Sequence, residues 1–205
     1  MREIRILYSD DDMVVCVKPA GVSSEEEMPA LLHGALCVHR LDTAVGGVMV
    51  YAKNKSSAAA LSRVIAERKM EKTYLAVCSG APEEKTGVMR DYLFKDSRSN
   101  KVFPVKTLRK GAKEAELAYE VLAEKDGTAL VKITLHTGRS HQIRVQFASR
   151  KMPLLGDGKY GSRVKGNIAL WSYALRFAHP VSGEEMRFVC PPDWEYFPEV
   201  DHAEF

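Results

Sequence analysis

His39-Arg40-Leu41-Asp42, followed by Gly46-Gly47 and the apolar run Val48-Met49-Val50-Tyr51-Ala52, is the stretch on which the fold prediction depends. A continuous apolar run of this kind is typical of a strand buried on both faces. The glycines permit a turn before the strand. Asp42 is therefore expected at an exposed strand end, where scaffold-held loops often carry chemistry. Because an Arg-x-Asp triplet also occurs as an ordinary surface ion pair, this stretch alone does not assign a function.

Length and composition predict one globular domain over residues 1–205, with an acidic tail at about residues 195–205. No apolar stretch approaches the roughly 20 residues of a membrane span, and the N-terminus lacks the apolar run of a signal peptide. The sequence therefore predicts a cytoplasmic protein that does not contact a membrane. No association motif is present, so a monomer is expected.

Four cysteines are scattered along the chain, at positions 16, 37, 78 and 190, and none forms a Cys-x-x-Cys pair. Three of them lie in apolar runs, which predicts reduced core thiols. The histidines are not clustered at the spacing of metal ligands. We therefore predict neither a metal site nor a cofactor.

Charge is unevenly distributed, although the net charge is only +3. Residues 90–113 carry eight basic side chains and two acidic ones, a local +6. Residues 183–205 carry seven acidic side chains and one arginine, a local −6. A basic segment on an otherwise balanced chain is what phosphate binding requires, and it is also compatible with a solvated lysine-rich hairpin.

The hydrophobic periodicity predicts runs of strands with few helices. Strands are expected at residues 2–8, 13–18, 48–52, 73–78, 88–106 with a hairpin tip at 96–100, 116–122, 129–136, 169–177 and 185–189. Helices are expected at 28–36, at 56–70 with Asn54 or Ser56 as N-cap, and from Ser140, as N-cap, to about 150. Runs of strands without regular βαβ alternation indicate an α+β fold, with a mixed, mostly antiparallel sheet flanked by helices.

Two further stretches change the functional prediction. Glu-Lys-Thr-Tyr-Leu-Ala-Val occupies residues 71–77, and Leu-His-Thr-Gly-Arg-Ser-His-Gln-Ile-Arg-Val occupies residues 135–145. Together with His39-Arg40-Leu41-Asp42, and in this order, they resemble the RluA family of RNA pseudouridine synthases. The resemblance continues through residues 155–161 and 171–180, so it covers about residues 14–194. It implies a pseudouridine synthase core in a short form without a separate N-terminal RNA-binding domain.

The resemblance also implies roles for single residues. Asp42 matches the family's catalytic aspartate, and Arg144 matches the arginine that keeps this carboxylate charged. Tyr74 matches the tyrosine that packs against the target base. Arg40 matches an arginine that enters the RNA in place of the extruded base. We assign the remaining family-matched residues to RNA binding: Lys72, Arg139 and His141.

The residues themselves agree with part of this assignment. Arginine is always charged and binds a carboxylate through two parallel hydrogen bonds, so Arg144 suits a buried acid. A strand tyrosine such as Tyr74 is also a common core residue, and its ring can pack while its hydroxyl stays polar. Arg139 precedes the helix expected after Ser140, whose free N–H groups favour phosphate.

Two departures from the family pattern lie beside these residues. Val45 stands where the family commonly has threonine, although Thr43 could compensate, and Gln146 stands where histidine is frequent. They put the choice of substrate in doubt. The leading prediction is isomerisation of uridine to pseudouridine in ribosomal or transfer RNA. The alternatives are a non-catalytic RNA-binding or remodelling protein, and a metal-dependent hydrolase using His39, Asp42 and His141.

Overall fold

The computed structural model describes residues 3–198, 200 and 201. The backbone divides into two compact units. The N-terminal unit comprises Met1–Thr73 and Trp171–Pro192, and the central unit comprises Tyr74–Leu170 and Asp193–Phe205. A single catalytic domain over residues 1–205 therefore stays a prediction. Of the expected acidic tail, residues 199 and 202–205 lie outside the described residues.

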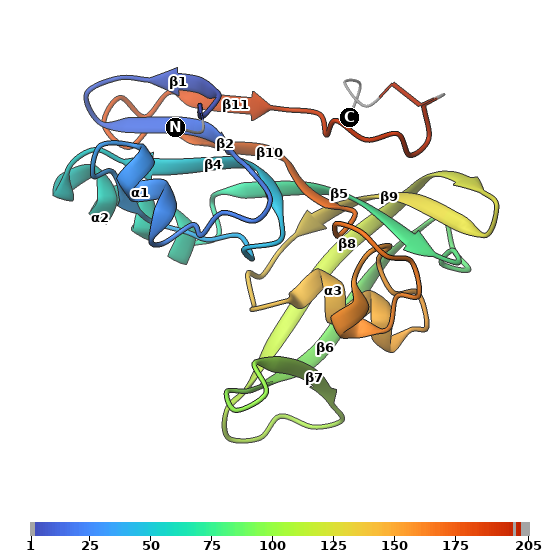
Figure 1. The fold of residues 1–205 in the computed structure, drawn as a ribbon. Helices are drawn as coiled ribbons and strands as arrows, with labels where there is room; N and C mark the ends of the chain where they lie inside the picture. Colours follow the sequence, from blue (N-terminus) through green and yellow to red (C-terminus); the bar gives the residue numbers. More distant parts are fainter. Residues whose placement is uncertain (1–2, 199, 202–205) are drawn as a thin grey trace. The chain divides into compact units, whose positions relative to one another are not determined.

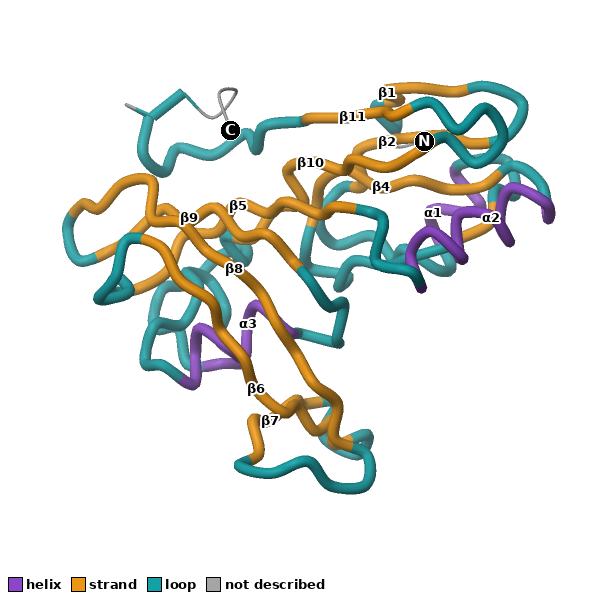
Figure 2. Tube along the Cα trace, turned by 180° about the vertical axis from the view of Figure 1, so that it is seen from behind, coloured by secondary structure: helices purple, strands orange, loops and turns teal. Residues whose placement is uncertain are grey.

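The N-terminal unit is built around the strand order β1-β2-β4-β10, with β3 added to β4 and β11 added to β10. Its elements are β1 (Ile6–Ser9), β2 (Met13–Lys18), α1 (Glu27–Leu31), β3 (Leu36–Cys37), β4 (Gly46–Ala52), α2 (Lys55–Ala66), β10 (Leu170–Ala178) and β11 (Glu185–Val189). Figures 1 and 2 show α1 and α2 on the same face of this sheet. The pairing of β4 with β10 is parallel, and the other pairings of this unit are antiparallel.

Glycines at the start of β4 permit the parallel pairing with β10. A Cβ atom at Gly46 would lie 2.4 Å from the ring of Trp171, and one at Gly47 would lie 2.2 Å from the carbonyl oxygen of Ser172. Gly47 also has a φ of +121°, which L side chains rarely adopt. The two glycines therefore let β10 approach the strand that follows Asp42.

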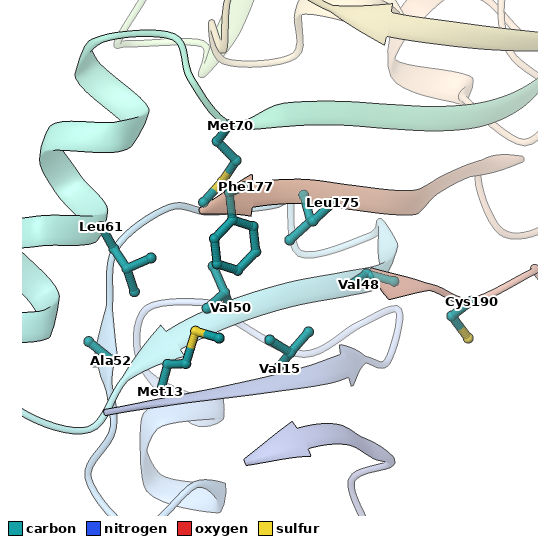
Figure 3. Packing of buried hydrophobic residues seen from close by; sticks show 10 residues of the cluster. All are labelled: Met13, Val15, Val48, Val50, Ala52, Leu61, Met70, Leu175, Phe177 and Cys190. Carbon is teal, nitrogen blue, oxygen red and sulfur yellow. The ribbon is translucent and has the colours of Figure 1, made fainter. Parts of the chain in front are cut away.

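The core of the N-terminal unit lies between its sheet and α2 (Figure 3). Each of the three central strands contributes a pair of buried side chains, which are Met13 and Val15, Val48 and Val50, and Leu175 and Phe177. Leu61 of α2 closes the cluster and is fully buried. All residues of β4 are buried, so the predicted strand with two covered faces is confirmed.

The central unit contains the strand order β5-β9-β8-β6-β7. Its elements are β5 (Glu71–Ser79, whose first residues belong to the N-terminal unit), β6 (Thr86–Asp96), β7 (Lys101–Val105), β8 (Ala112–Lys125), β9 (Thr128–Leu135), α3 (Gln142–Ser149) and the 3-10 turn η1 (Gly158–Tyr160). Strand β9 pairs with residues 117–125 of β8, whereas β6 pairs with residues 112–120 of the same strand. Strands β6 and β8 therefore continue as a pair beyond the end of β9. Strand β7 pairs with this extension and closes a basic hairpin at the predicted tip (Figure 2).

The predicted α+β class and mostly antiparallel sheet are confirmed, whereas three details were wrong. The helix expected at residues 28–36 is α1, which ends at Leu31, and Leu36 already belongs to β3. Ser140 is not the cap of α3, because His141 occupies the N-cap position in a left-handed conformation with φ of 51° and makes no side-chain cap bond. Helix α2 ends at Ala66 and not at residue 70, because Arg68 turns left-handed with φ of 59°. Asn54 caps α2, since its side chain accepts a hydrogen bond from the N–H of Ser57.

The described helices include none with the length and apolar character needed to cross a membrane. Three of the cysteines are buried, as predicted for core thiols, and all four are unpaired by disulfides. Burial raises the pKa of the Cys16 and Cys78 thiols to about 12, so both are unreactive at neutral pH.

Candidate active site

Asp42 opens a tight turn that leads directly into β4. The N–H of Val45 donates to the Asp42 carbonyl oxygen at 2.9 Å and closes this turn. Asp42 is half-buried, and Thr43 and Ala44 are exposed. The side chain of Val45 is 2% exposed and belongs to the core. Asp42 therefore occupies the strand-end position that the sequence predicts, and valine replaces threonine at a position that packs inward.

The segment before Asp42 is fixed by a buried hydroxyl. Ser24 donates to the carbonyl oxygen of Leu41 at 3.0 Å and accepts from the N–H of the same residue at 3.2 Å. The Tyr51 hydroxyl donates to the carbonyl oxygen of Ser24 at 3.0 Å. These bonds connect Leu41, the residue before Asp42, to Tyr51 of β4 through Ser24. They therefore fix the backbone at the start of the turn.

His39 is a second anchor of this segment. Its Nε2 accepts a hydrogen bond from the N–H of Val50 at 3.2 Å. Burial, together with the charge of Lys72, holds the pKa of His39 well below its usual range. A neutral imidazole is also what the accepting role of Nε2 requires. His39 therefore supports the Asp42 turn and carries no charge at neutral pH.

The two candidate RNA-binding residues of the N-terminal unit differ in exposure. Arg40 is exposed, and its Nη1 lies 3.1 Å from Oε2 of Glu25 in a surface ion pair. Lys72 is half-buried, and burial lowers its pKa. Arg40 is thus the more accessible of the two cations for a phosphate or base.

In the central unit, Arg144 forms a bidentate pair with Asp157. Its Nε lies 2.7 Å from Oδ2 and its Nη2 lies 2.8 Å from Oδ1 of that carboxylate. The side chains are 7% and 1% exposed, so the pair is shielded from water. This geometry fixes the plane of the guanidinium. Since Asp42 lies in the N-terminal unit, its predicted pairing with Arg144 stays a prediction.

Tyr160 joins this pair to His141. The Arg144 guanidinium carbon lies 5.1 Å from the centre of the Tyr160 ring, a cation–π arrangement. The Tyr160 hydroxyl accepts from the N–H of Val102 at 2.9 Å and lies 2.7 Å from Nδ1 of His141. His141 keeps its left-handed backbone in this setting. A non-glycine residue in that conformation persists where its surroundings determine it, often at functional sites.

Arg139 lies in the loop before α3, which a glutamine side chain organises. Oε1 of Gln142 accepts from the Arg139 N–H at 3.1 Å and from the Thr137 hydroxyl at 2.7 Å. The Arg139 Nε donates to the carbonyl oxygen of Glu114 at 2.8 Å. Arg139 is therefore bonded to the start of β8, the strand that follows the β6–β7 hairpin in the chain.

Tyr74, a candidate site residue, and Gln146, one of the two departures from the family pattern, also lie in this unit. Tyr74 lies on β5 and is 7% exposed, so most of its ring is buried. Gln146 is fully buried, and its Nε2 donates to the carbonyl oxygen of Met89 and to Oδ2 of Asp91. Gln146, which stands where the family often has histidine, therefore connects α3 with β6.

The basic segment, residues 90–113, lies at the surface and comprises most of the β6–β7 hairpin and the start of β8. Seven of its eight cations are exposed, and Lys101 is half-buried. Phe103 and Leu108 are also exposed, at 43% and 58%. The Arg109 guanidinium lies 4.9 Å from the centre of the Phe94 ring. Cations interleaved with exposed apolar groups suit a single-stranded or looped nucleic acid.

Among the described residues, the group of side chains spaced for a metal ion is Asp10, Asp12 and His179. These side chains already bond one another or neighbouring groups, including the Asn54 amide and the Ser57 hydroxyl. The hydrolase hypothesis gains no support from this group, because it contains none of the three residues that the hypothesis names.

The sequence analysis did not single out Asp157, Tyr160 or Lys18. The first two lie in the quoted stretch at residues 155–161, but nothing in it indicated a pairing with α3. Lys18 is fully buried at the end of β2. The available signal was a lysine that ends an apolar strand directly before Pro19-Ala20-Gly21.

Comparisons with known proteins agree on one family. The model of the RNA pseudouridylate synthase family matches residues 12–149, a range that includes Asp42, Tyr74 and Arg144. An uncharacterized RNA pseudouridine synthase of Aquifex aeolicus is 37% identical over 90% of this chain and 68% of its own length. The dual-specificity RNA pseudouridine synthase RluA of Escherichia coli is 34% identical over 92% of this chain and 93% of its own length.

Two further comparisons extend this agreement. A ribosomal large subunit pseudouridine synthase C of Buchnera aphidicola is 29% identical over 92% of this chain and 67% of its own length. The structure of human RNA pseudouridylate synthase domain containing 1 superposes with a TM-score of 0.82 and 24% identity, covering 97% of this chain and 86% of the human one. The latter likeness concerns the fold.

Proposed function

Because the chain belongs to the family of RNA pseudouridylate synthases, we propose that it isomerises uridines of ribosomal or transfer RNA to pseudouridine through Asp42. The enzyme class, an isomerase acting on RNA, follows from the family itself. The choice of RNA is suggested by two relatives, since one is named for dual specificity and another for the large ribosomal subunit.

The reaction defines what the protein must supply. The bond between N1 of uracil and C1′ of the ribose breaks, the base turns, and C5 forms a new bond to C1′. C5 loses its hydrogen as a proton and N1 gains one, so neither an oxidant nor a group donor is consumed. The protein must provide a nucleophile or charge stabiliser, a group that transfers protons, and a pocket for a base flipped out of the RNA.

The observation that carries the proposal is the anchored turn of Asp42 within the family-matched range. Ser24 and His39 hold the segment before it, and Val45 closes it. A backbone fixed in this way would place the Asp42 side chain reproducibly, which is the geometric demand on a catalytic group. Attack on the sugar, attack on the base and assistance to a glycal intermediate all use an ionised Asp42, and we leave these three routes open.

Arg144 and Tyr74 complete the proposed site. Arg144 would stabilise the ionised form of Asp42 by its permanent charge, and Asp157 would orient it for this role. Tyr74 would pack its ring on the target base. We do not assign proton transfer to its hydroxyl, since an ordinary phenol titrates near ~10 and is a poor base at neutral pH.

RNA binding is assigned to the basic hairpin of β6 and β7 together with Arg40, Lys72, Arg139 and His141. The exposed cations would neutralise phosphates, so affinity should fall steeply as salt concentration rises. Recognition would then depend on RNA shape and on a uridine in a splayed loop. The cytoplasmic location and the monomeric state stay predictions.

Tritium release tests this proposal directly. Unmodified ribosomal and transfer RNA transcripts carrying uridine labelled with ³H at C5 are incubated separately with the wild type and with Asp42→Asn. Asp11→Asn, a change of an exposed aspartate in the β1–β2 turn, is the matched control. Release by the wild type and by Asp11→Asn, with at least a ~100-fold loss in Asp42→Asn, is expected.

The alternative function is a non-catalytic RNA-binding protein that keeps the fold, and the exposed basic hairpin is the observation that favours it. It predicts salt-sensitive RNA binding without tritium release from either RNA. It also predicts that Asp42→Asn leaves RNA binding and the cellular role unchanged. The assay therefore separates the two functions.

A further inference from the structure

The short turn η1 contacts both Arg144 and the β6–β7 hairpin within the central unit. On one side, Asp157, the residue directly before η1, forms the buried bidentate pair with Arg144. On the other side, Nζ of Lys159 donates to the carbonyl oxygen of Asn100 at the tip of the hairpin. One turn of the chain therefore joins the arginine of the proposed site to the segment assigned to RNA binding.

Tyr160, the last residue of η1, makes both contacts with one side chain. The guanidinium carbon of Arg144 lies 5.1 Å from the centre of its ring, and Nζ of Lys101 lies 5.8 Å from the same centre. Both distances are within the roughly 6 Å of a cation–π interaction. The Tyr160 hydroxyl accepts from the N–H of Val102 at 2.9 Å. The ring thus contacts α3, and the hydroxyl holds the backbone of β7.

The hydroxyl of Tyr160 has a second partner at the start of α3. It lies 2.7 Å from Nδ1 of His141, and the two rings meet edge to face with their centres 5.6 Å apart. Val102 is 2% exposed, so a phenylalanine at position 160 would leave its N–H shielded from water and without this acceptor.

Core packing alone does not account for a tyrosine here. The Tyr160 ring packs against a small cluster of buried side chains, which are Leu93, Val102, Ala115 and Val145. A phenylalanine would fill the same space. What the hydroxyl adds is a pair of directed hydrogen bonds, one to β7 and one to α3, and such bonds fix the orientation of a ring that contacts a guanidinium.

We infer that Tyr160 is a positioning residue that couples the β6–β7 hairpin to Arg144, so that RNA held by the hairpin fixes the guanidinium for its role toward Asp42. The inference rests on the proposed function, because that function gives the hairpin and Arg144 their roles. Asp157 orients the guanidinium without contacting β7. Tyr160 differs because it contacts both partners, as a coupling between two places requires.

The first test is kinetic and compares Tyr160→Phe with Tyr119→Phe. Tyr119 is a half-buried tyrosine of β8 whose ring packs against Phe147 of α3, so its variant is a matched loss of one hydroxyl. Tyr160→Phe is expected to reduce kcat for tritium release about fivefold or more, with KM and RNA affinity within about twofold of the wild type. Tyr119→Phe should leave all three quantities within about twofold.

Two outcomes of the kinetic test would overturn the inference. If Tyr160→Phe kept the wild-type kcat, the hydroxyl would not serve catalysis. If the variant lost RNA affinity and kept kcat, Tyr160 would support only the shape of the hairpin.

The second test measures the coupling itself by NMR, through hydrogen exchange of the Arg144 Nε–H in the ¹⁵N-labelled full chain. A short oligouridylate is the RNA probe, at a concentration that saturates each protein. It should slow exchange about threefold or more in the wild type, and have half that effect or less in Tyr160→Phe. The joint replacement of Lys106, Arg109 and Lys110 by alanine should also weaken the effect. Equal slowing in all three proteins, or none in the wild type, would overturn the inference.

The two tests separate this inference from the proposed function. Absence of tritium release by the wild type would contradict the proposed function, whereas the exchange measurement needs no turnover and would still report whether Tyr160 couples the hairpin to Arg144. Release by the wild type with equal kcat in Tyr160→Phe would keep the function and overturn the role of Tyr160.

Discussion

At the scale of single residues, the ion pairs of this protein differ most in their access to water. Arg144 and Asp157 are nearly inaccessible and bond through two hydrogen bonds. Arg40 and Glu25 are more than half exposed and bond through one. Breaking a buried pair leaves an uncompensated charge and costs about 3–5 kcal/mol, whereas an exposed pair contributes about 0–1 kcal/mol. The buried pair is therefore the one on which the structure depends.

Asp157→Asn tests this difference. The substitution keeps the shape of the side chain and removes its charge, so Arg144 loses the carboxylate of this bidentate pair. We expect the free energy of unfolding to fall by about 3 kcal/mol and tritium release to fall about tenfold or more, since the guanidinium is no longer oriented. Urea denaturation and the release assay measure the two effects.

Glu25→Gln is the matched control for Asp157→Asn. It also removes one carboxylate from an arginine, but at the surface, and it should change the free energy of unfolding by less than about 1 kcal/mol. If the two variants were equally stable, the Arg144–Asp157 pair would not contribute to the fold as its burial indicates.

At the scale of elements, the β6–β7 hairpin and the start of β8 carry the densest exposed positive charge of any segment singled out above. We expect the joint replacement of Lys106, Arg109 and Lys110 by alanine to weaken RNA binding and to reduce its dependence on salt. The logarithmic salt slope should fall by about 1 for each lost phosphate contact. Filter binding across a salt series measures both quantities.

The control for this prediction removes three exposed cations from α2 and the turn that follows it, namely Lys55, Arg63 and Arg68. It lowers the net charge by the same amount, so any effect of overall charge appears in both variants. An equal loss of affinity in the two variants would show that net charge, and not the hairpin, controls RNA binding.

The start of α2 permits a second prediction about an element. Asn54 accepts from the N–H of Ser57 at 2.8 Å, and its amide also donates to Oδ1 of Asp12 at 2.9 Å. Asn54→Ala should therefore lower the free energy of unfolding by about 1 kcal/mol. Ser56→Ala changes the other candidate cap, which is exposed and lies inside the helix, and should have no measurable effect. Thermal or urea denaturation distinguishes them.

The strands could largely be predicted from the sequence, because their signals are local. The apolar run of β4 and the alternating patterns of β8 and β9 indicate directly which residues of these strands are buried. Helix ends were less predictable. Arg68, after the end of α2, and His141, at the start of α3, adopt left-handed conformations that usually favour glycine. Their residue types therefore did not indicate these helix ends.

The candidate site was predictable where it follows a motif and not where it depends on contacts between distant residues. Asp42, Tyr74 and Arg144 came from the resemblance to the family. The partner of Arg144 in the central unit is 13 positions away, and Lys18 reaches a carbonyl 25 positions away. Which carboxylate or carbonyl lies opposite a buried cation is decided by the packing of the whole unit, and no local pattern encodes it.

At the scale of the whole chain, the N-terminal unit combines the first 73 residues with Trp171–Pro192. Asp10 and His179 connect these two segments, since Nε2 of His179 lies 2.7 Å from Oδ2 of Asp10. Nδ1 of the same imidazole accepts from the N–H groups of Val181 and Ser182. The hydrogen of the neutral ring therefore resides on Nε2, which donates to the carboxylate.

The other contacts of Asp10 also favour its charged form. Burial acts to raise the pKa of this carboxyl, but hydrogen bonds from the backbone of Met13 and Asp12 and from the side chains of Tyr8 and His179 outweigh it. The pKa of Asp10 consequently lies well below its usual range. A carboxyl with a lowered pKa stabilises the folded state above the pKa of the unfolded chain, near ~3.9, and this contribution is lost as the pH falls below that value.

Asp10→Asn should therefore lower the free energy of unfolding at pH 7 and leave it less dependent on pH between about pH 5 and pH 2. Urea denaturation across this range measures the effect, and Asp11→Asn, a change of the exposed neighbour, should retain the wild-type dependence. If Asp10→Asn kept the acid sensitivity of the wild type, the loss of stability at low pH would have to come from other carboxylates with a lowered pKa. Glu116 is one of them, because Arg90 and His136 lower its pKa. Since Glu116 lies in the central unit, Glu116→Gln would in that case be the variant that loses the acid sensitivity.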